Sequence, residues 1–190
     1  MIVPKCASTT PTSFRELHCL TTMTTTAKTA IITGGASGFG LETAKSLLSD
    51  GWIVHIFDLN AKAGEAVIRE HTGLEFRQVD VTSWDSLSSA FKAVFSSRGR
   101  LDLVFANAGV LPQEDFYAID DAVPPVEPRH TCININLKAV ANTCQLTRYY
   151  LRTSKQLGQD RVLVMTASIG GFVSSYPSPF IGNTRSGMEE

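Results

Sequence analysis

The sequence predicts an α/β fold, in which a doubly wound parallel sheet carries helices on both of its faces. Two observations predict it: five short apolar or β-branched runs alternate with segments of helical periodicity, and a glycine-rich turn follows the first run. Alternation of this kind is typical of a parallel sheet joined by right-handed crossovers. We expect a single domain over residues 28–190, preceded by a disordered leader over residues 1–27.

The expected strands are short runs rich in Val, Ile, Leu and Phe. The first, TAIIT, is strongly β-branched, WIVHIFD is typical of a buried strand, and LEFRQVDV alternates like a strand with one buried face. LDLVFANAG and RVLVMTAS complete the set. These strands cover residues 29–33, 52–58, 74–81, 101–109 and 161–168.

The expected helices lie between these strands. Leu41, Ala44 and Leu48 share one helical face in the first of them, and Gly51 ends it. Ser83 is the expected N-cap of the third helix. The helices cover residues 41–51, 60–73, 83–99 and 130–157, and a loop rich in Pro and acidic residues occupies 110–128 before the last and longest one.

Composition excludes several classes of function. The net charge of −1 carries no basic excess for nucleic acid or an anionic membrane, and no apolar run approaches the ~20 residues of a spanning helix. The 4 cysteines form no CxxC pair and have no histidine pattern beside them, so we expect free thiols and no bound metal. We therefore expect a cytoplasmic protein.

Residues 1–23 are rich in Ser and Thr and lack the apolar core of a secretory signal. Two interpretations stay open. The segment is either a weak organellar transit peptide, or a disordered leader upstream of a second start at Met23; its poor amphipathicity favours the leader.

The turn GGASGFG after the first strand is typical of a dinucleotide site. Gly34 permits a tight exit from the strand, Gly38 lets the backbone approach a pyrophosphate, and Gly40 permits close packing of the helix against the sheet. Ser37 and Phe39 lie within the same turn. Free N–H groups and the dipole at the start of the helix favour an anion there.

Asp58 ends the second strand and favours NAD over NADP. A carboxylate at this point accepts hydrogen bonds from ribose hydroxyls and repels a 2′-phosphate. Neither the turn nor the residues after the strand (Leu59, Asn60) supply an Arg or Lys for that phosphate. The alternative is that Asp58 only caps the following helix.

Five motifs occur in a fixed order: TGGASGFG (33–40), FD (57–58), VDV (79–81), NAG (107–109) and NL (136–137). On these motifs the chain from about Lys28 onward resembles the short-chain dehydrogenase/reductase family. The resemblance implies a Rossmann-type fold and hydride exchange between a nicotinamide cofactor and a secondary alcohol or ketone. It further implies roles for individual residues: Asp80 and Val81 at the adenine, Asn107, Ala108 and Gly109 along the cofactor, Asn136 beside a proton-relay water, and Ser168 at the substrate carbonyl.

The acid–base pair that the resemblance implies is replaced. The family places a tyrosine thirteen residues after the serine and a lysine four residues later, where this chain has Ile181 and Arg185. Isoleucine exchanges no proton. Arginine keeps the positive charge that binds the nicotinamide ribose, but it does not readily release a proton. None of the four tyrosines is followed by a lysine at that spacing.

The chain ends at Glu190, before the further strands and substrate-covering segment of the family. We therefore expect an incomplete sheet in which residues 161–168 form an apolar edge. The helix at 130–157 is a candidate surface for a homo-oligomer, by resemblance.

Three hypotheses follow. The chain is an oxidoreductase that is degenerate or uses another proton route, a non-catalytic protein that binds NAD or a partner, or a truncated product without activity of its own. The intact cofactor motifs favour the first two, and Ile181 with Arg185 favours the second over the first.

Overall fold

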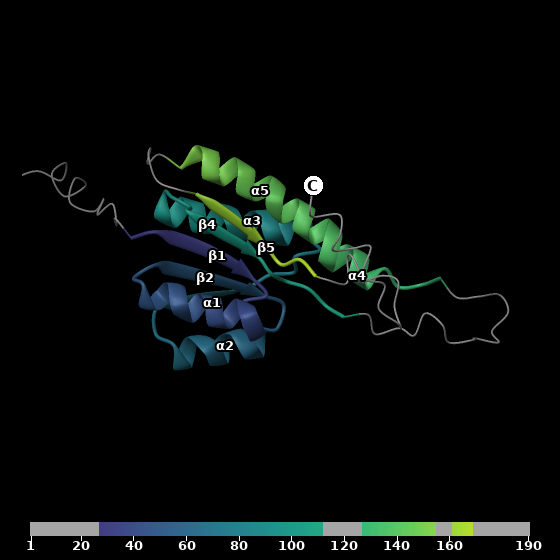
Figure 1. Ribbon diagram of the computed structural model, residues 1–190, viewed down its shortest axis with the longest axis horizontal. Coiled ribbons are helices and arrows are strands. Elements are labelled where there is room, and N and C mark those ends of the chain that lie inside the picture. Colours follow the sequence, from purple (N-terminus) through teal and green to yellow (C-terminus); the bar gives the residue numbers. More distant parts are fainter. Residues whose placement is uncertain (1–26, 112–126, 155–160, 169–190) are drawn as a thin grey trace, which may run out of the picture.

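The computed structural model describes residues 27–111, 127–154 and 161–168, and it confirms the predicted α/β fold (Figure 1). Five strands alternate with helices along the chain. In order, the elements are β1 (Thr29–Thr33), α1 (Gly38–Ser49), β2 (Ile53–Asp58), α2 (Ala61–Glu70), β3 (Leu74–Gln78), α3 (Trp84–Arg98), β4 (Leu103–Ala106), α4 (Thr131–Ile133), η2 (Asn134–Ala139), α5 (Val140–Thr153) and β5 (Val162–Met165).

The five strands form one parallel sheet in the order β3-β2-β1-β4-β5. The chain runs outward from β1 through β2 to β3, and then returns to place β4 on the other side of β1. In open α/β sheets, ligands bind at the carboxyl ends of the strands beside such a reversal. The topology therefore points to the carboxyl ends of β1 and β4.

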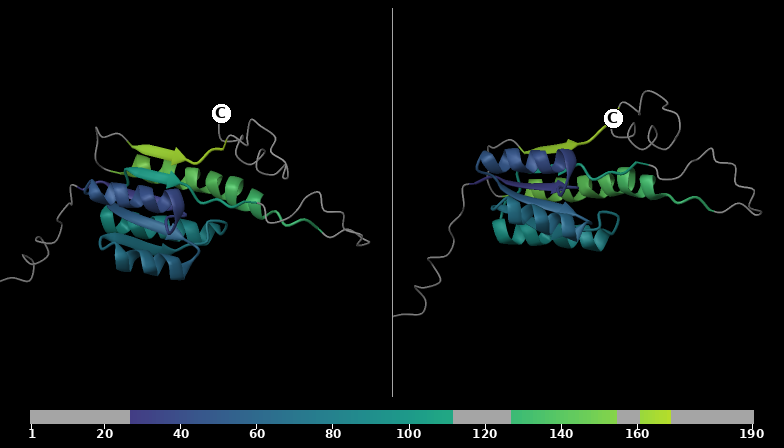
Figure 2. Two further views of the ribbon diagram at one scale, coloured as in Figure 1. Left: turned by 60° about the horizontal axis from the view of Figure 1, so that its bottom comes forward. Right: turned by 90° about the horizontal axis from the view of Figure 1, so that it is seen from below.

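The helices form two layers, one on each face of the sheet (Figure 1, Figure 2). Ile32 belongs to the core under α1 and α2, together with Ala44. Its neighbour Ile31 belongs to the opposite core under α3 and α5, together with Phe91. Because successive side chains of a strand point to opposite faces, β1 is buried on both sides, which explains its uninterrupted apolar sequence.

Local signals set the ends of α3 as predicted. Ser83 is confirmed as its N-cap, because its hydroxyl accepts the N–H of Ser86 at 3.3 Å. The helix ends at Gly99, which has a left-handed φ of 68° and donates its N–H to the Phe95 carbonyl at 2.8 Å.

Several predicted boundaries are wrong by a few residues. β2 begins at Ile53, β3 ends at Gln78, β4 spans only Leu103–Ala106, and α1 begins already at Gly38. β3 stops early because Asp80 starts a turn of its own.

The predicted helix 130–157 is wrong in two respects. Residues Asn134–Ala139 form a π-helical segment between α4 and α5, and α5 ends at Thr153. The helix ends there because Ser154 has extended backbone angles (ψ 125°) and its hydroxyl exchanges hydrogen bonds with the backbone N–H and carbonyl of Leu101, at 3.0 and 3.2 Å. These bonds tie the end of α5 to the segment that leads into β4.

A buried ion pair lies at the amino end of the central strands. Arg100 and Asp102 are each 3% exposed, and the Arg100 Nη2 donates to Asp102 Oδ1 at 2.6 Å. The second carboxylate oxygen accepts from Arg100 Nε and from the backbone N–H of Thr29, both at 2.8 Å. The pair therefore joins the start of β1 to the start of β4.

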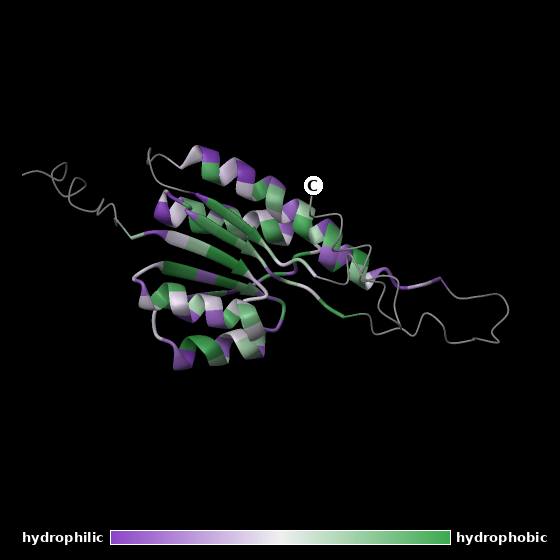
Figure 3. Cartoon of the chain, in the orientation of Figure 1, coloured by the Kyte–Doolittle hydropathy of each residue, from purple (hydrophilic) through white to green (hydrophobic). Residues whose placement is uncertain are grey.

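The predicted apolar edge at β5 is observed within the described residues. β5 pairs with β4 and with no other described strand. Leu163 packs against the core under α5, whereas Val162 and Val164 are 42% and 41% exposed. Figure 3 shows that the strands of the sheet are predominantly hydrophobic. None of the helices in the described parts of the chain has both the length and the apolar character that crossing a bilayer requires.

Candidate functional site

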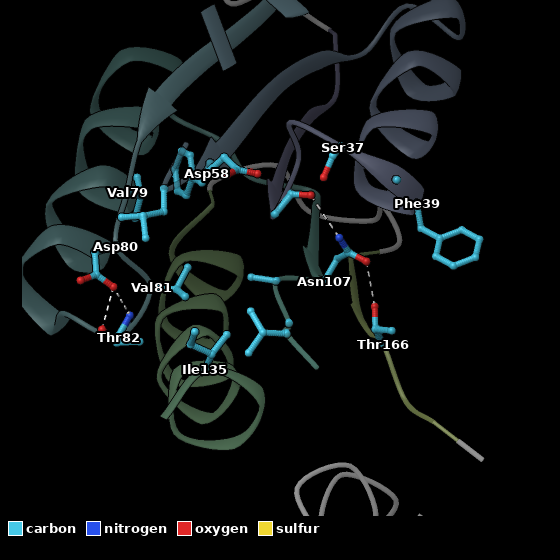
Figure 4. A pocket seen from close by; sticks show the side chains of 17 residues that line it. Ser37, Phe39, Asp58, Val79, Asp80, Val81, Thr82, Asn107, Ile135 and Thr166 are labelled. Atoms are coloured by element: carbon cyan, nitrogen blue, oxygen red, sulfur yellow. Dashed lines mark hydrogen bonds between the residues drawn. The ribbon is translucent and has the colours of Figure 1, made fainter. Parts of the chain in front are cut away.

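A cavity of about 490 Å³ opens at the carboxyl ends of β1, β2 and β4 (Figure 4). This volume lies in the range of small-molecule and cofactor sites. The cavity collects side chains and backbone from segments far apart in the sequence. Its wall consists of Gly34, Ser37, Gly38, Phe39, Phe57, Asp58, Leu59, Val79, Asp80, Val81, Thr82, Asn107, Ala108, Gly109, Val110, Ile135 and Thr166.

Ten of the eleven residues predicted to bind the cofactor line this cavity. The exception is Gly40, which lies behind the wall. A Cβ at Gly40 would stand 2.3 Å from the Gly34 carbonyl oxygen and 2.7 Å from Asn107 Nδ2. Gly40 is therefore needed for the close approach of α1 to the turn itself, rather than to the sheet as predicted.

Gly38 faces the open space of the cavity. Its φ of +51° belongs to the left-handed region, and a Cβ built on it would meet no atom within 4 Å. The backbone at this point is exposed to a ligand without a side chain in between. This geometry fits the close approach that the glycine pattern predicts.

The first turn of α1 presents uncapped N–H groups at the same place. The Leu41 N–H makes the first bond of the helix, to the Ser37 carbonyl at 3.2 Å, so the N–H groups of Gly38, Phe39 and Gly40 precede the helical ladder. Ser37 is the N-cap residue, but its hydroxyl caps none of them, and the first turn holds no acidic residue. The helix start is thus a positive end available to an anion. The Phe39 side chain points away from the cavity and is 81% exposed, so its backbone is the part near the site (Figure 4).

Asp58 links the second strand to the glycine turn. Its Oδ2 accepts the N–H of Ala36 at 3.1 Å, and its Oδ1 accepts the N–H of Asn60 at 3.0 Å. The alternative that Asp58 caps α2 is wrong: Asn60 is the N-cap, and its side chain accepts the N–H of Ala63 at 3.0 Å. The Asp58 carboxylate therefore does not cap α2, and it borders the cavity.

Asp80 and Val81 form the side of the cavity beyond β3. The Asp80 Oδ1 accepts both the N–H and the hydroxyl of Thr82, at 2.9 and 2.7 Å. The Asp80 N–H donates to Ser86 Oγ at 3.1 Å, which fastens this turn to α3. Val81 packs against the core beneath and offers an apolar surface to the cavity.

Asn107 stands at the centre of the site. Its Nδ2 donates to the carbonyls of Thr33 and Gly34, at 3.3 and 3.2 Å. Its Oδ1 accepts the hydroxyl of Thr166 at 3.1 Å (Figure 4). In addition, Thr33 Oγ1 accepts the N–H groups of Asn107 and Ala108, both at 3.1 Å. Asn107 is therefore more than a cap on β4, because its side chain joins the ends of β1, β4 and β5.

Asn136 holds the chain that leaves β4. Its Oδ1 accepts the N–H of Val110 and its Nδ2 donates to the Val110 carbonyl, both at 2.9 Å. Asn136 is 2% exposed and lies within the π-helical segment, a form that is frequent at functional sites. Both polar atoms of its side chain are thus bonded to the Val110 backbone. Ile135, its neighbour, lines the cavity.

The remaining predicted catalytic residues are placed only in part. Ser168 is half-buried, three positions after the end of β5, and is not part of the cavity wall. Ile181 and Arg185 lie outside the described residues.

Sequence reasoning missed several residues of the wall. Thr166, Val110 and Ile135 carried no separate signal: Val110 follows NAG, Ile135 precedes NL, and Thr166 lies within the strand predicted at 161–168. A signal for Thr166 exists only in the pairing of β5 with β4, where Met165 stands opposite Ala106 and the next residues on each strand are Thr166 and Asn107. Within the described ranges, no three His, Cys, Asp or Glu side chains gather as a metal site.

Comparison with protein families gives one consistent result. Residues 28–180 match the model of the family described as short chain dehydrogenase. Short-chain dehydrogenase/reductase prx7 of Penicillium rubens is 37% identical over 156 residues, covering 78% of this chain and 55% of the relative. The NADP-dependent dehydrogenase clz5 of Cochliobolus lunatus is 39% identical over 131 residues, covering 65% of this chain and 46% of the relative.

A solved structure shares the same architecture. The crystal structure of gox2181 superposes with a TM-score of 0.70 at 25% identity, covering 85% of this chain and 62% of that one. The chain spans about half the length of the curated relatives it matches.

Proposed function

The chain belongs to the short-chain dehydrogenase/reductase family, and we propose that it binds NAD in the cavity at the carboxyl end of its sheet. We propose in addition that the site is of the type that exchanges hydride with a secondary alcohol or ketone, with its proton transfer impaired. One observation carries the proposal: the glycine turn, Asp58 and Asn107 wall a single cavity at the point where the strand order reverses.

The residues present fit a dinucleotide. The uncapped N–H groups at the start of α1 suit a pyrophosphate, and the left-handed backbone of Gly38 leaves room for it. Val81 and Leu59 offer apolar surface to an adenine, and Asn107 to Gly109 form the opposite wall. Bound there, NAD would accept a hydride or, in its reduced form, supply one, and the residues of the chain would bind and orient the ligands.

We propose NAD rather than NADP because of Asp58. Its carboxylate borders the cavity, and both of its oxygens are held by backbone N–H groups, so it cannot turn away from a 2′-phosphate without breaking two hydrogen bonds. The residues beside it, Leu59 and Asn60, offer no positive charge. One relative is named an NADP-dependent dehydrogenase, whereas Asp58 favours NAD in this chain. Asp58 is therefore the residue to test.

The substrate side of the cavity is apolar in the described residues. Val110 and Ile135 line it, and Leu111 follows with 74% of its surface exposed. A substrate of apolar character fits these side chains, and the class of secondary alcohols and ketones is taken from the family.

Proton transfer is the weak step of the proposed reaction. Ser168 would orient the substrate carbonyl, but Ile181 stands where a proton donor is expected and Arg185 does not relay one. Loss of a general acid costs ~10²–10⁴ in rate. We therefore propose slow turnover, with water or the substrate as the proton donor.

Ile181 and Arg185 also favour a second candidate function. A chain that keeps the cofactor turn and lacks the acid–base pair is suited to bind NAD without turnover, as a non-catalytic binding protein. The two candidates share the cofactor site and differ only in chemistry.

The test combines binding with turnover on the 190-residue chain. NADH is titrated into the protein while nicotinamide fluorescence is followed, and NADH-dependent reduction of a panel of ketones is then assayed in the parent and in Ile181→Tyr/Arg185→Lys. Binding with slow turnover in the parent and faster turnover in the variant supports the proposal. Binding without turnover in either protein supports the non-catalytic candidate. Absence of binding at millimolar NADH overturns both.

A further inference from the structure

Thr166 is the first residue beyond β5, and its position links that strand to the cofactor site. Its N–H donates to the Ala106 carbonyl at 3.2 Å, which continues the pairing with β4 by one residue. Its hydroxyl donates to Asn107 Oδ1 at 3.1 Å, and its side chain lines the cavity (Figure 4). The hydroxyl thus bonds to a side chain of the site rather than to the sheet.

The Thr166 hydroxyl fixes the orientation of the Asn107 side-chain amide. A primary amide donates only through its nitrogen and accepts only through its oxygen. The two carbonyls of Thr33 and Gly34 require the nitrogen on their side, at 3.3 and 3.2 Å. The oxygen must then point toward β5, where the Thr166 hydroxyl meets it. Removal of this hydroxyl leaves the partly buried oxygen without its protein donor.

The glycine turn has little freedom to move independently of Asn107. A Cβ at Gly40 would stand 2.3 Å from the Gly34 oxygen and 2.7 Å from Asn107 Nδ2, so the start of α1, the turn and the amide lie in direct contact. A rotation of the amide would therefore release the Gly34 carbonyl and loosen the first turn of α1. That turn carries the N–H groups that face the cavity.

We infer that Thr166 is a positioning residue of the cofactor site, which acts through Asn107 on the glycine turn. Its hydroxyl orients the Asn107 amide, the amide holds the Gly34 carbonyl, and the turn after Gly34 presents its N–H groups to the ligand. The same bond anchors the segment that leads to Ser168. This inference rests on the proposed function, because it assigns Thr166 to the binding of the same NAD.

The alternative is a purely structural role, in which the Thr166 hydroxyl stabilises the fold as any buried hydroxyl does. Thr147 provides the matched comparison. It is 1% exposed on α5, and its hydroxyl donates to the Thr143 carbonyl at 2.7 Å, away from the cavity. Thr166→Val and Thr147→Val each remove one bonded hydroxyl and keep the shape of the side chain.

The test compares Thr166→Val, Thr166→Ser and Thr147→Val with the parent by NADH titration and by thermal unfolding. We expect Thr166→Val to raise the dissociation constant for NADH about tenfold, which corresponds to 1.4 kcal/mol. Thr166→Ser keeps the hydroxyl and should bind NADH within about twofold of the parent. Thr147→Val should leave NADH binding unchanged although it lowers the unfolding temperature.

Amide hydrogen exchange of the ligand-free protein gives a second, independent measurement. Thr166→Val should accelerate exchange about tenfold at the hydrogen-bonded amides of Ala36, Leu41 and Ala108, whereas Thr166→Ser and Thr147→Val should not. If the parent fails to bind NADH, the proposed function falls, and this exchange pattern alone decides whether Thr166 controls the turn. The inference is overturned if Thr166→Val matches the parent in exchange, or if Thr166→Ser is as impaired as Thr166→Val.

Discussion

The Oδ2 atom of Asp58 accepts the backbone N–H of Ala36 at 3.1 Å, so the carboxylate at the end of β2 is bonded directly to the glycine turn that follows β1. A single side chain therefore serves two purposes. It holds the turn in shape, and it places a negative charge on the wall of the cavity. Because the two purposes need different properties of the group, hydrogen-bond acceptance and charge, they can be separated by mutation.

Asp58→Asn should change cofactor preference while preserving the turn. The amide oxygen retains one acceptor, and the repulsion of a 2′-phosphate is removed. We expect the ratio of NADPH to NADH affinity to rise about tenfold, whereas Asp58→Ala should weaken both ligands because the Ala36 N–H loses its acceptor. Dissociation constants from fluorescence titration check this. Asp85→Asn on the exposed start of α3 is the charge-matched control. If it changes the ratio of NADPH to NADH affinity as much as Asp58→Asn does, the prediction is wrong.

Gly38→Ala should abolish NADH binding, and its cost to stability should be no more than that of an alanine in the same backbone conformation elsewhere. Gly38 has a φ of +51° and Gly99 a φ of +68°, and a Cβ on either would meet no atom within 4 Å. Both substitutions to Ala should thus lower the free energy of unfolding by about 1–2 kcal/mol, the cost of a left-handed alanine. Gly38 lines the cavity and Gly99 does not, so only Gly38→Ala should lose NADH binding.

Urea unfolding and NADH titration of Gly38→Ala and Gly99→Ala measure the two effects separately. Gly99 ends α3 outside the cavity wall and carries the same backbone strain. Retained NADH binding in Gly38→Ala, or equal loss in Gly99→Ala, would show that the turn is structural and not a ligand site.

The sequence predicts the fold class and most of the segments that line the cavity, but not the bounds of every element. The glycine turn, Asp58 and Asn107 follow strands whose pattern is local, and the topology of parallel sheets brings their carboxyl ends together. Thr166 could not be predicted, because its bond to Asn107 depends on the register of β5 against β4, which no local pattern specifies. The π-helical segment at Asn134–Ala139 also has no local signal, since its residues are compatible with an ordinary α-helix.

His55 illustrates a second limit of sequence reasoning. It lies within the apolar run of β2, and only the register of β2 with β3 shows that it stands opposite Glu75. His55 is 4% exposed, its Nδ1 lies 3.3 Å from Glu75 Oε2, and its Nε2 has no hydrogen-bond partner among the described residues. Arg98 of α3 bonds to the same Glu75, and Arg77 lies nearby on β3.

Stability should fall on acidification because of His55. Burial, with Arg98 and Arg77, lowers the pKa of His55 below its ordinary value of 6.5, and Glu75 opposes this only in part. The unfolded chain therefore binds the proton more readily than the folded chain. The contribution to stability is complete above pH 6.5 and is lost as the pH falls through 6.5 toward the folded pKa, with a slope of at most about 1.4 kcal/mol per pH unit.

Urea unfolding of the parent, His55→Gln and His71→Gln between about pH 5 and 8 checks this dependence. His55→Gln should flatten the acidic slope. His71→Gln, at the partly exposed end of α2, should leave it as in the parent. A slope that persists in His55→Gln would assign the dependence to other groups.

The ion pair of Arg100 and Asp102 should show the asymmetry expected of buried charges. Asp102→Asn keeps an acceptor for the Thr29 N–H but removes the carboxylate charge that Arg100, 3% exposed, contacts through Nε and Nη2. We expect a loss of about 3–5 kcal/mol in the free energy of unfolding. Glu42→Gln, which breaks the exposed pair of Glu42 with Lys45, should cost at most about 1 kcal/mol.

The double variant Arg100→Met/Asp102→Asn tests whether the buried guanidinium needs the Asp102 carboxylate. It removes both charges, keeps an acceptor for the Thr29 N–H and retains an unbranched apolar side chain at position 100. If the loss in Asp102→Asn comes from the guanidinium charge that no longer faces the Asp102 carboxylate, the double variant should recover most of it, because an apolar group needs no charge partner in the interior. Urea unfolding of the parent and both variants measures this. If the double variant is less stable than Asp102→Asn alone, the guanidinium contributes through its other interactions, and the attribution to the Asp102 carboxylate is wrong.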